Sequence, residues 1–147
     1  MNNITIKTSY PPSVFKGARI VKTPEYKEFV ESIVAAFTER RDALDRADFY
    51  AVEIIAFPED RRGRTLDNLF KATFDALTAA QVWDEASQVV SVNAMSGPAA
   101  EDPFLVVKIK TFVYPTIPEL IPETWGEKTR EFDWTQVSKK LRVYNVK

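Results

Sequence analysis

The sequence predicts an α+β domain in which a mixed four-stranded sheet packs against two helices, followed by a C-terminal extension. Segments with strand and helix periodicity follow one another in the order strand, helix, strand, helix, strand, strand. The 147 residues are enough for one domain with a single core, and a hydrophobic content of 45% is ordinary for a globular protein. We therefore place the domain at residues 1–114 and the extension at residues 115–147.

The first half of the domain contains one strand and one helix. We expect the strand at residues 3–8, where isoleucines alternate with polar residues. The helix should begin after Thr23, a typical N-cap, because Pro24 then occupies the first helical position. Its apolar residues recur at helical spacing, and we expect it to run to about residues 43–48.

A buried strand and a second helix follow. Residues 49–57 are apolar almost throughout, which predicts a central strand, and residues 58–65 form a polar loop. The second helix is expected from residue 66 or 67 to residue 80. Its predicted buried side consists of large apolar residues, namely Leu66, Leu69, Phe70, Phe74 and Leu77.

The domain is expected to end with two strands. A connector at residues 83–87 begins with Trp83, which we expect to close the end of the second helix. The third strand is predicted at residues 89–94. The fourth, at residues 104–112, has the clearest alternation of apolar and polar residues in the chain.

The composition excludes several kinds of site. Cysteine and histidine are both absent, so disulfides, thiolate ligands and imidazole bases or ligands are excluded. Any metal would sit among oxygen ligands, which favours magnesium, manganese or calcium. The formal net charge of −1 argues against a uniformly basic DNA-binding surface but permits a local basic patch. With no membrane segment or export signal in view, we expect a cytoplasmic protein without a membrane partner.

The most informative motif lies at residues 60–78, which read DRRGRTLDNLFKATFDALT, and the connector that follows at residues 83–89 reads WDEASQV. Together they resemble the central motif of the RusA family of Holliday-junction resolvases. That family has a basic loop, then Asp-Leu-Asp-Asn-Leu-x-Lys, a helix containing Phe-Asp-Ala-Leu, and a connector Trp-x-Asp-Asp-x-Gln-Val. The resemblance covers roughly residues 3–112 and implies a RusA-like fold.

The resemblance implies a homodimer that binds branched DNA and cuts four-way junctions symmetrically with Mg²⁺. We expect Mg²⁺ or Mn²⁺ as the cofactor if the site is active, and otherwise none. The family's catalytic groups are the two Asp of the first motif, the second Asp of the connector and the motif Lys. Carried over by position, these fall on Thr65, Asp67, Ala86 and Lys71. One catalytic carboxylate of the three is kept.

The two replacements predict weak or lost nuclease activity. Mg²⁺ retains most of its water, so one carboxylate holds it weakly, while a threonine hydroxyl is neutral and alanine offers no ligand. Losing one catalytic contact commonly costs about two to three orders of magnitude in rate. The alternative is an active resolvase in which Asp67 works with Glu85 or Asp84, with Asp67 and Glu85 as the metal ligands.

The basic loop offers a DNA-binding surface. Arg61, Arg62 and Arg64, together with Lys71, are expected to contact phosphates, although three arginines can also form an ordinary solvated loop. Asp67 likewise has a plain alternative role at a helix N-terminus, where Lys71 would be its i,i+4 partner.

A third hypothesis comes from the near-neutral charge and the aromatic extension. The fold could be reused as a protein-binding regulator or inhibitor, with a phage origin as an option that would place it in a host cytoplasm. Trp125, Phe132 and Trp134 are large apolar groups in a polar context. We expect them to pack on the domain or its dimer, and the other option is that they dock a protein partner.

Overall fold

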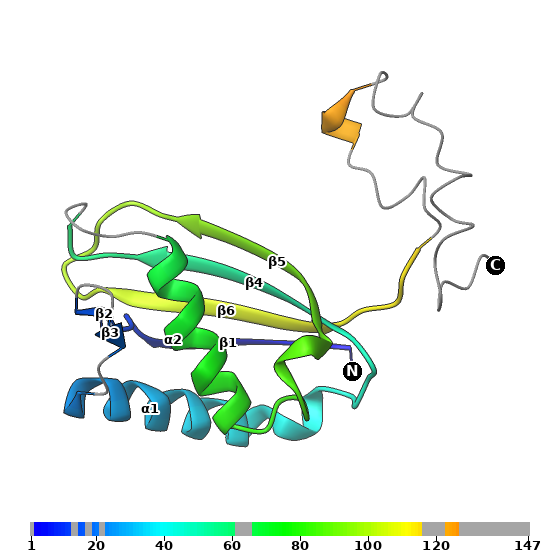
Figure 1. The fold of residues 1–147 in the computed structure, drawn as a ribbon, viewed down its shortest axis with the longest axis horizontal. Helices are drawn as coiled ribbons and strands as arrows, with labels where there is room; N and C mark the ends of the chain where they lie inside the picture. The colour runs from blue at the N-terminus through cyan, green and yellow to red at the C-terminus, as the bar shows by residue number, and fades with distance from the viewer. Residues whose placement is uncertain are drawn as a thin grey trace. The chain divides into compact units, whose positions relative to one another are not determined.

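The computed structural model describes part of the chain, namely residues 2–12, 15–16, 19–20, 23–60, 66–115 and 123–126. It divides the chain into two compact units, Met1–Phe112 and Val113–Lys147. The first unit contains the predicted α+β fold, with a mixed four-stranded sheet and two helices (Figure 1). Among the helices that are described, none has the length and apolar character needed to cross a bilayer.

The main sheet has the strand order β1-β6-β4-β5. Its strands are β1 (Asn3–Ser9), β4 (Tyr50–Phe57), β5 (Val89–Ser96) and β6 (Phe104–Thr111). β6 is antiparallel to both β1 and β4, whereas β4 and β5 are parallel. The mixed sheet and the interior position of β4 are confirmed.

One face of the sheet forms the core. Along β6, Leu105, Val107 and Ile109 are fully buried while their neighbours in the strand are only partly covered. β1 shows the same alternation, with Ile4 and Ile6 buried. Because successive side chains of a strand point to opposite faces, the two helices cover one face, and residues of the other face such as Val106 and Lys108 are only partly buried.

Helix α1 (Pro24–Arg40) begins as predicted. The hydroxyl of Thr23 accepts a hydrogen bond of 3.2 Å from the backbone N–H of Tyr26. The helix ends earlier than the expected residues 43–48, because a 3₁₀ turn, η1 (Arg41–Ala43), follows it and the chain is extended at Leu44. The poor helix formers Asp42, Asp45 and Asp48 are concentrated in this segment, which accounts for the early end.

Helix α2 (Leu66–Ala79) is the crossover that the parallel pair β4–β5 requires. Its fully buried residues are mostly small ones, namely Leu69, Ala72, Thr73, Ala76 and Leu77. Leu66 is 40% exposed, so its predicted burial is wrong. Leu66 shares a helical face with the buried Thr73 and Leu77, so its exposure reflects its place at the first residue of the helix. Phe70 and Phe74 are partly buried at its flank, and their rings stack with centroids 5.9 Å apart.

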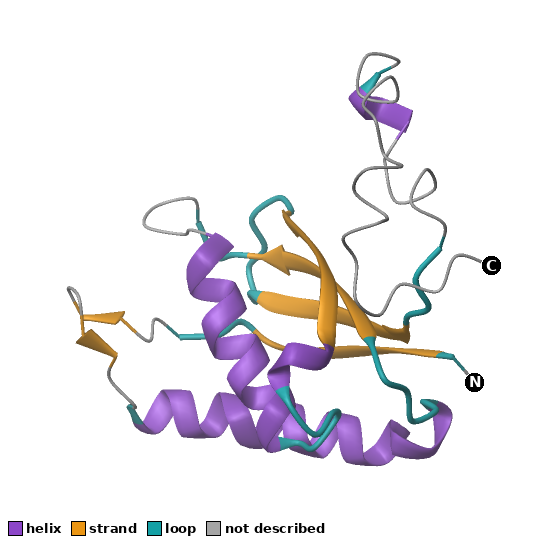
Figure 2. Ribbon diagram, turned by 45° about the vertical axis from the view of Figure 1, so that its right-hand side comes forward, coloured by secondary structure: helices purple, strands orange, loops and turns teal. Residues whose placement is uncertain are grey.

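Two short features were not predicted. A hairpin of β2 (Phe15–Lys16) and β3 (Arg19–Ile20) forms a separate two-stranded sheet, which stands apart from the main sheet in Figure 2. In the second unit, a 3₁₀ turn, η3 (Glu123–Trp125), is described, and Trp125 is exposed. Phe132 and Trp134 lie outside the described residues, so the packing of the extension stays a prediction.

Candidate functional site

The predicted site residues fall at two places in the domain. Asp67 is the second residue of α2, and only its backbone is described. Arg61, Arg62, Arg64 and Thr65 precede the helix and lie outside the described residues. Their roles, and that of Asp67 as a metal ligand, therefore stay predictions.

Lys71 forms an ion pair with Asp75, a carboxylate for which no role was predicted. Its Nζ lies 3.1 Å from Oδ2 of Asp75, one helical turn further along α2. Both side chains are about two-fifths exposed, so the ion pair contributes little to the free energy of unfolding. Its main effect is to hold the Lys71 side chain in position. The i,i+4 spacing from Lys71 to Asp75 was the available signal, and it is the same spacing as from Asp67 to Lys71.

Asp75 also links the two helices. The hydroxyl of Tyr26, on α1, donates a hydrogen bond of 3.2 Å to Oδ2 of Asp75. Burial of Tyr26, and then the negative charge and hydrogen bond of Asp75, raise the pKa of this tyrosine to about 12. Lys71, Asp75 and Tyr26 thus form a continuous polar chain, which places Lys71 on the side of α2 that faces α1.

The connector after α2 is anchored by Trp83. This side chain is buried, and its Nε1 donates a hydrogen bond of 3.0 Å to Oγ1 of Thr78, so it closes the end of α2 as predicted. Its ring also packs against Tyr50 at the beginning of β4, with centroids 6.0 Å apart. Trp83 thereby holds the connector at the end of the sheet where β4 and β5 begin.

The acidic residues of the connector are exposed and have local partners. Asp84 lies 3.3 Å from Arg46 in an ion pair, and its side chain is 82% exposed. Glu85 is the N-cap of the 3₁₀ turn η2 (Ala86–Gln88), where a capping box joins it to Gln88. Ala86 is exposed at the first position of that turn, so the connector presents a methyl group where the family motif has an acid.

The two groups of acids lie at opposite ends of α2. The helix runs back from the end of β4 to the beginning of β5, so its start lies near the end of β4 and the connector lies near the beginning of both strands (Figure 1). At a rise of about 1.5 Å per residue, Asp67 and Ala79 are about 18 Å apart along the helix. Within one chain, the structure does not bring Asp67 together with Glu85 or Asp84. Across the described ranges there is no group of three acidic residues placed to hold a metal.

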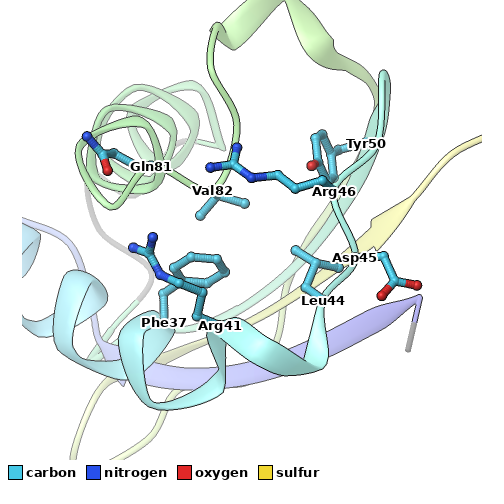
Figure 3. Close-up of a pocket in the computed structure, with 8 residues that line it drawn as sticks. All are labelled: Phe37, Arg41, Leu44, Asp45, Arg46, Tyr50, Gln81 and Val82. Atoms are coloured by element: carbon cyan, nitrogen blue, oxygen red, sulfur yellow. The ribbon is translucent and has the colours of Figure 1, made fainter.

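A small pocket lies at the connector end of the domain (Figure 3). It has a volume of about 40 Å³, and its lining residues are Phe37, Arg41, Leu44, Asp45, Arg46, Tyr50, Gln81 and Val82. This volume holds only a few water molecules. Arg41 donates a hydrogen bond of 3.0 Å to the carbonyl of Ala80, just beyond α2, so it caps that helix.

Comparisons with known proteins agree with the motif. The model of the family described as endodeoxyribonuclease RusA matches residues 16–110. The crossover junction endodeoxyribonuclease RusA of Escherichia coli (strain K12) is 50% identical over 106 residues, which cover 69% of this chain and 88% of that protein. The protein of the same name from Shigella sonnei (strain Ss046) has the same identity and coverage. The crossover junction endodeoxyribonuclease rusA of Enterobacteria phage 82 is 50% identical over 42 residues, or 29% of this chain and 35% of its own length.

Proposed function

Because the chain belongs to the RusA family of endodeoxyribonucleases, we propose that it binds branched DNA at four-way junctions and that its metal-dependent cleavage is weak or lost. The observation that carries this proposal is the exposed methyl group of Ala86 at the connector's acid position, next to a carboxylate already used as a cap. Thr65 at the first motif position supports it from the sequence. Both changes remove negative oxygens from a reaction that needs them to hold Mg²⁺.

The remaining acids of the connector support reduced rather than absent metal binding. Asp84 is held by Arg46, but an ion pair this exposed is weak and can open. Glu85 would have to leave its capping position to bind a metal, at the cost of the hydrogen bonds it makes there. Each is an oxygen donor that is available only after a local contact is broken.

The geometry of α2 supports a homodimer as the binding unit. If Asp67 and the connector bind one metal ion together, they must come from different chains, because about 18 Å separates the two ends of the helix. Mg²⁺ or Mn²⁺ would then lie between Asp67 of one copy and Glu85 of the other, with Lys71 nearby. In that arrangement the chain's own residues would orient the phosphate, and the ion would supply charge neutralisation and an activated water.

An active resolvase that uses Asp67 with Glu85 or Asp84 is the second candidate. It is favoured by one observation, namely that the two connector acids, at the two positions before Ala86, are both exposed. A labelled four-way junction tests both candidates. We expect salt-sensitive binding at nanomolar to micromolar concentrations and little cleavage with Mg²⁺ or Mn²⁺.

Two outcomes of this experiment would contradict the proposal. Rapid symmetric cleavage that disappears in Asp67→Asn would replace it with the active resolvase. Equal affinity for junction and for duplex of the same length would argue against branched DNA as the ligand. So would the absence of any salt-sensitive binding, and either result would favour the hypothesis of a protein partner.

A further inference from the structure

The small pocket of Figure 3 has an apolar floor and a polar rim. Phe37 and Val82 are buried and form part of the floor. Arg41, Arg46 and Gln81 are exposed and surround it. A volume of about 40 Å³ limits a ligand to a group of a few heavy atoms. Because an apolar floor strengthens nearby polar interactions, the pocket is suited to one small charged group.

Two arginine side chains extend into this pocket. In Figure 3, Arg41 and Arg46 both reach from the segment after α1 toward Gln81. The hydrogen bond from Arg41 to the carbonyl of Ala80 uses only part of the donors of the guanidinium group, and it holds that group in place. The guanidinium also lies 5.4 Å from the ring centroid of Phe37. Arg41 is therefore a positioned cation with N–H groups left for a second acceptor.

The neighbouring acids leave the pocket with an excess of positive charge. Arg46 lies 3.3 Å from Asp84, but their side chains are 66% and 82% exposed, so this ion pair is weak and can open. Asp45 also lines the pocket, and its carboxylate points away from the two guanidinium groups in Figure 3. Two cations thus have one competing carboxylate beside them, that of Asp84.

Gln81 has an unusual backbone conformation. Its φ of 59° makes it the one non-glycine residue with positive φ in the part of the chain that the structure describes. Its N–H bonds to the carbonyl of Thr78 at 3.0 Å, and the N–H of Val82 bonds to that of Leu77 at 3.2 Å. Helices that end with this pattern usually have glycine at the position of Gln81. A side chain kept here at a cost in stability, on the wall of a pocket, indicates a role for that side chain.

Tyr50 adds a hydroxyl donor to the same pocket. It lines the pocket and is buried, and its hydroxyl accepts a hydrogen bond of 3.0 Å from the N–H of Ala47. Across the residues with described positions, no acceptor is found for the hydroxyl's own proton. The hydroxyl can therefore donate to an oxygen of a ligand, as the guanidinium groups and the Gln81 amide can.

We propose that this pocket binds a single phosphate group, held by both arginines, Gln81 and Tyr50. Donors that come from several directions suit a tetrahedral anion, whereas a flat carboxylate is satisfied by one guanidinium group. The small volume excludes a larger molecule from the pocket itself, so the rest of any ligand must lie outside it. Free inorganic phosphate and a phosphodiester of nucleic acid share the required chemistry.

Titration of the full chain with sodium phosphate tests the site, followed by ¹H–¹⁵N NMR of the arginine side chains. The Nε–H signals of Arg41 and Arg46 should move with a dissociation constant of about 1 mM or lower. Sodium chloride of equal ionic strength should leave them nearly unmoved. Dimethyl phosphate, which mimics the nucleic-acid backbone, distinguishes the two sources. Binding of both compounds identifies a backbone phosphate as a ligand, and binding of inorganic phosphate alone identifies a free phosphate.

Three variants should change the affinity in different directions. Arg46→Gln removes one cation and should weaken phosphate binding about tenfold or more. Asp84→Asn removes the competing carboxylate and should strengthen binding about threefold. Gln81→Gly should raise the urea midpoint, because glycine accepts the positive φ, and should nevertheless weaken binding about threefold. A more stable chain that binds less phosphate separates a role in binding from a role in the fold.

Arg40→Gln is the matched control for Arg46→Gln. Arg40 lies outside the pocket and donates to the carbonyl of Thr5, so its replacement should leave the affinity for phosphate unchanged. Signals that move equally with chloride and with phosphate would overturn the proposal, because screening alone would then account for them. An absence of response to both phosphate compounds would also overturn it, as would an affinity that Arg46→Gln leaves unchanged. None of these measurements uses a DNA junction, so their outcome is independent of the proposed function.

Discussion

At the scale of single residues, the proposed loss of cleavage depends on very few atoms of the connector. Ala86 contributes a methyl group where an acid would contribute two oxygens, and Glu85 is one position away but caps a 3₁₀ turn. Thr65 stands at the other changed position. Ala86 is exposed and lies outside the buried core, so the scaffold can be kept whether or not this position carries an acid.

Returning the two missing carboxylates should therefore raise cleavage. We expect Thr65→Asp combined with Ala86→Asp to increase symmetric junction cleavage with Mg²⁺ by about two orders of magnitude or more. The matched control is Thr65→Asn with Ala86→Asn, which has nearly the same shape without the charge. Equal rates for the two double variants would show that these positions do not limit cleavage.

Tyr26 gives a pH-dependent signature of the contact between the helices. Its pKa is raised from 10.0 to about 12, first by burial and then by Asp75, so the neutral form is favoured in the folded state. The stability that this tyrosine contributes is fully present below pH 10, falls as the pH rises from 10 to 12, and is lost above that range. Tyr26→Phe should remove this part of the alkaline loss of stability.

Titration of tyrosinate absorbance measures the same shift. The difference between the original chain and Tyr26→Phe should show a midpoint near 12. Asp75→Asn removes the charge but keeps the burial, so the midpoint should move only part of the way back towards 10.0. A midpoint that does not move in Asp75→Asn would contradict the contact between Tyr26 and Asp75.

The buried hydroxyl of Thr73 is expected to lower the free energy of unfolding. Its side chain is fully buried in α2, and its hydroxyl has no hydrogen-bond partner among the residues that the structure describes. Thr73→Val replaces the hydroxyl with a methyl group of similar shape and should raise the free energy of unfolding by about 1 kcal/mol. Urea denaturation measures the change, and a decrease would show that the hydroxyl is satisfied in solution.

At the scale of elements, α1 illustrates how a local signal sets a helix boundary. The Thr23 cap and Pro24 define its start, whereas its end has neither glycine nor proline and depends on weaker propensities. For the same reason, the start of α1 could be predicted to the residue and its end could not.

The cap can be tested against a matched threonine in the same helix. Thr23→Ala should lower the free energy of unfolding by about 1 kcal/mol, because the N–H of Tyr26 loses its acceptor. Thr38→Ala should be neutral or slightly stabilising, because Thr38 is exposed within the helix and donates to the carbonyl of Val34 at 2.6 Å. Equal effects in urea denaturation would show that the cap contributes nothing specific.

At the scale of the whole molecule, the net charge of −1 means that attraction to DNA must come from a local surface. The predicted surface is the loop before α2, which contains Arg61, Arg62 and Arg64. The two described elements that flank it in sequence, the end of β4 and the start of α2, lie at the end of the domain opposite the connector.

Replacing these three arginines with alanine should reduce the salt dependence of junction binding. Each lost phosphate contact lowers the slope of log affinity against log salt by about 0.9, so the triple variant should lose up to about 2.7. Arg40→Ala is the control, because Arg40 lies at the end of α1 and donates to the carbonyl of Thr5. An unchanged slope in the triple variant would mean that the loop does not contact phosphates.

The sequence by itself determined which segments become strands and helices, which face of β6 is buried, and that the central motif belongs to a known nuclease family. These properties follow from local periodicity, from capping residues and from contiguous motifs, all of which can be recognised within a short window. The exchange of acids at positions 65 and 86 could be recognised in the same way.

Only the tertiary structure decided the exposure of Leu66, the pairing of Lys71 with Asp75, the edge position of β5 among the described strands and the separation of Asp67 from the connector. Each depends on how segments distant in sequence pack and in what order the strands pair. Strand order and the extent to which a helix is covered are set by the fit of the whole core, which no local pattern specifies.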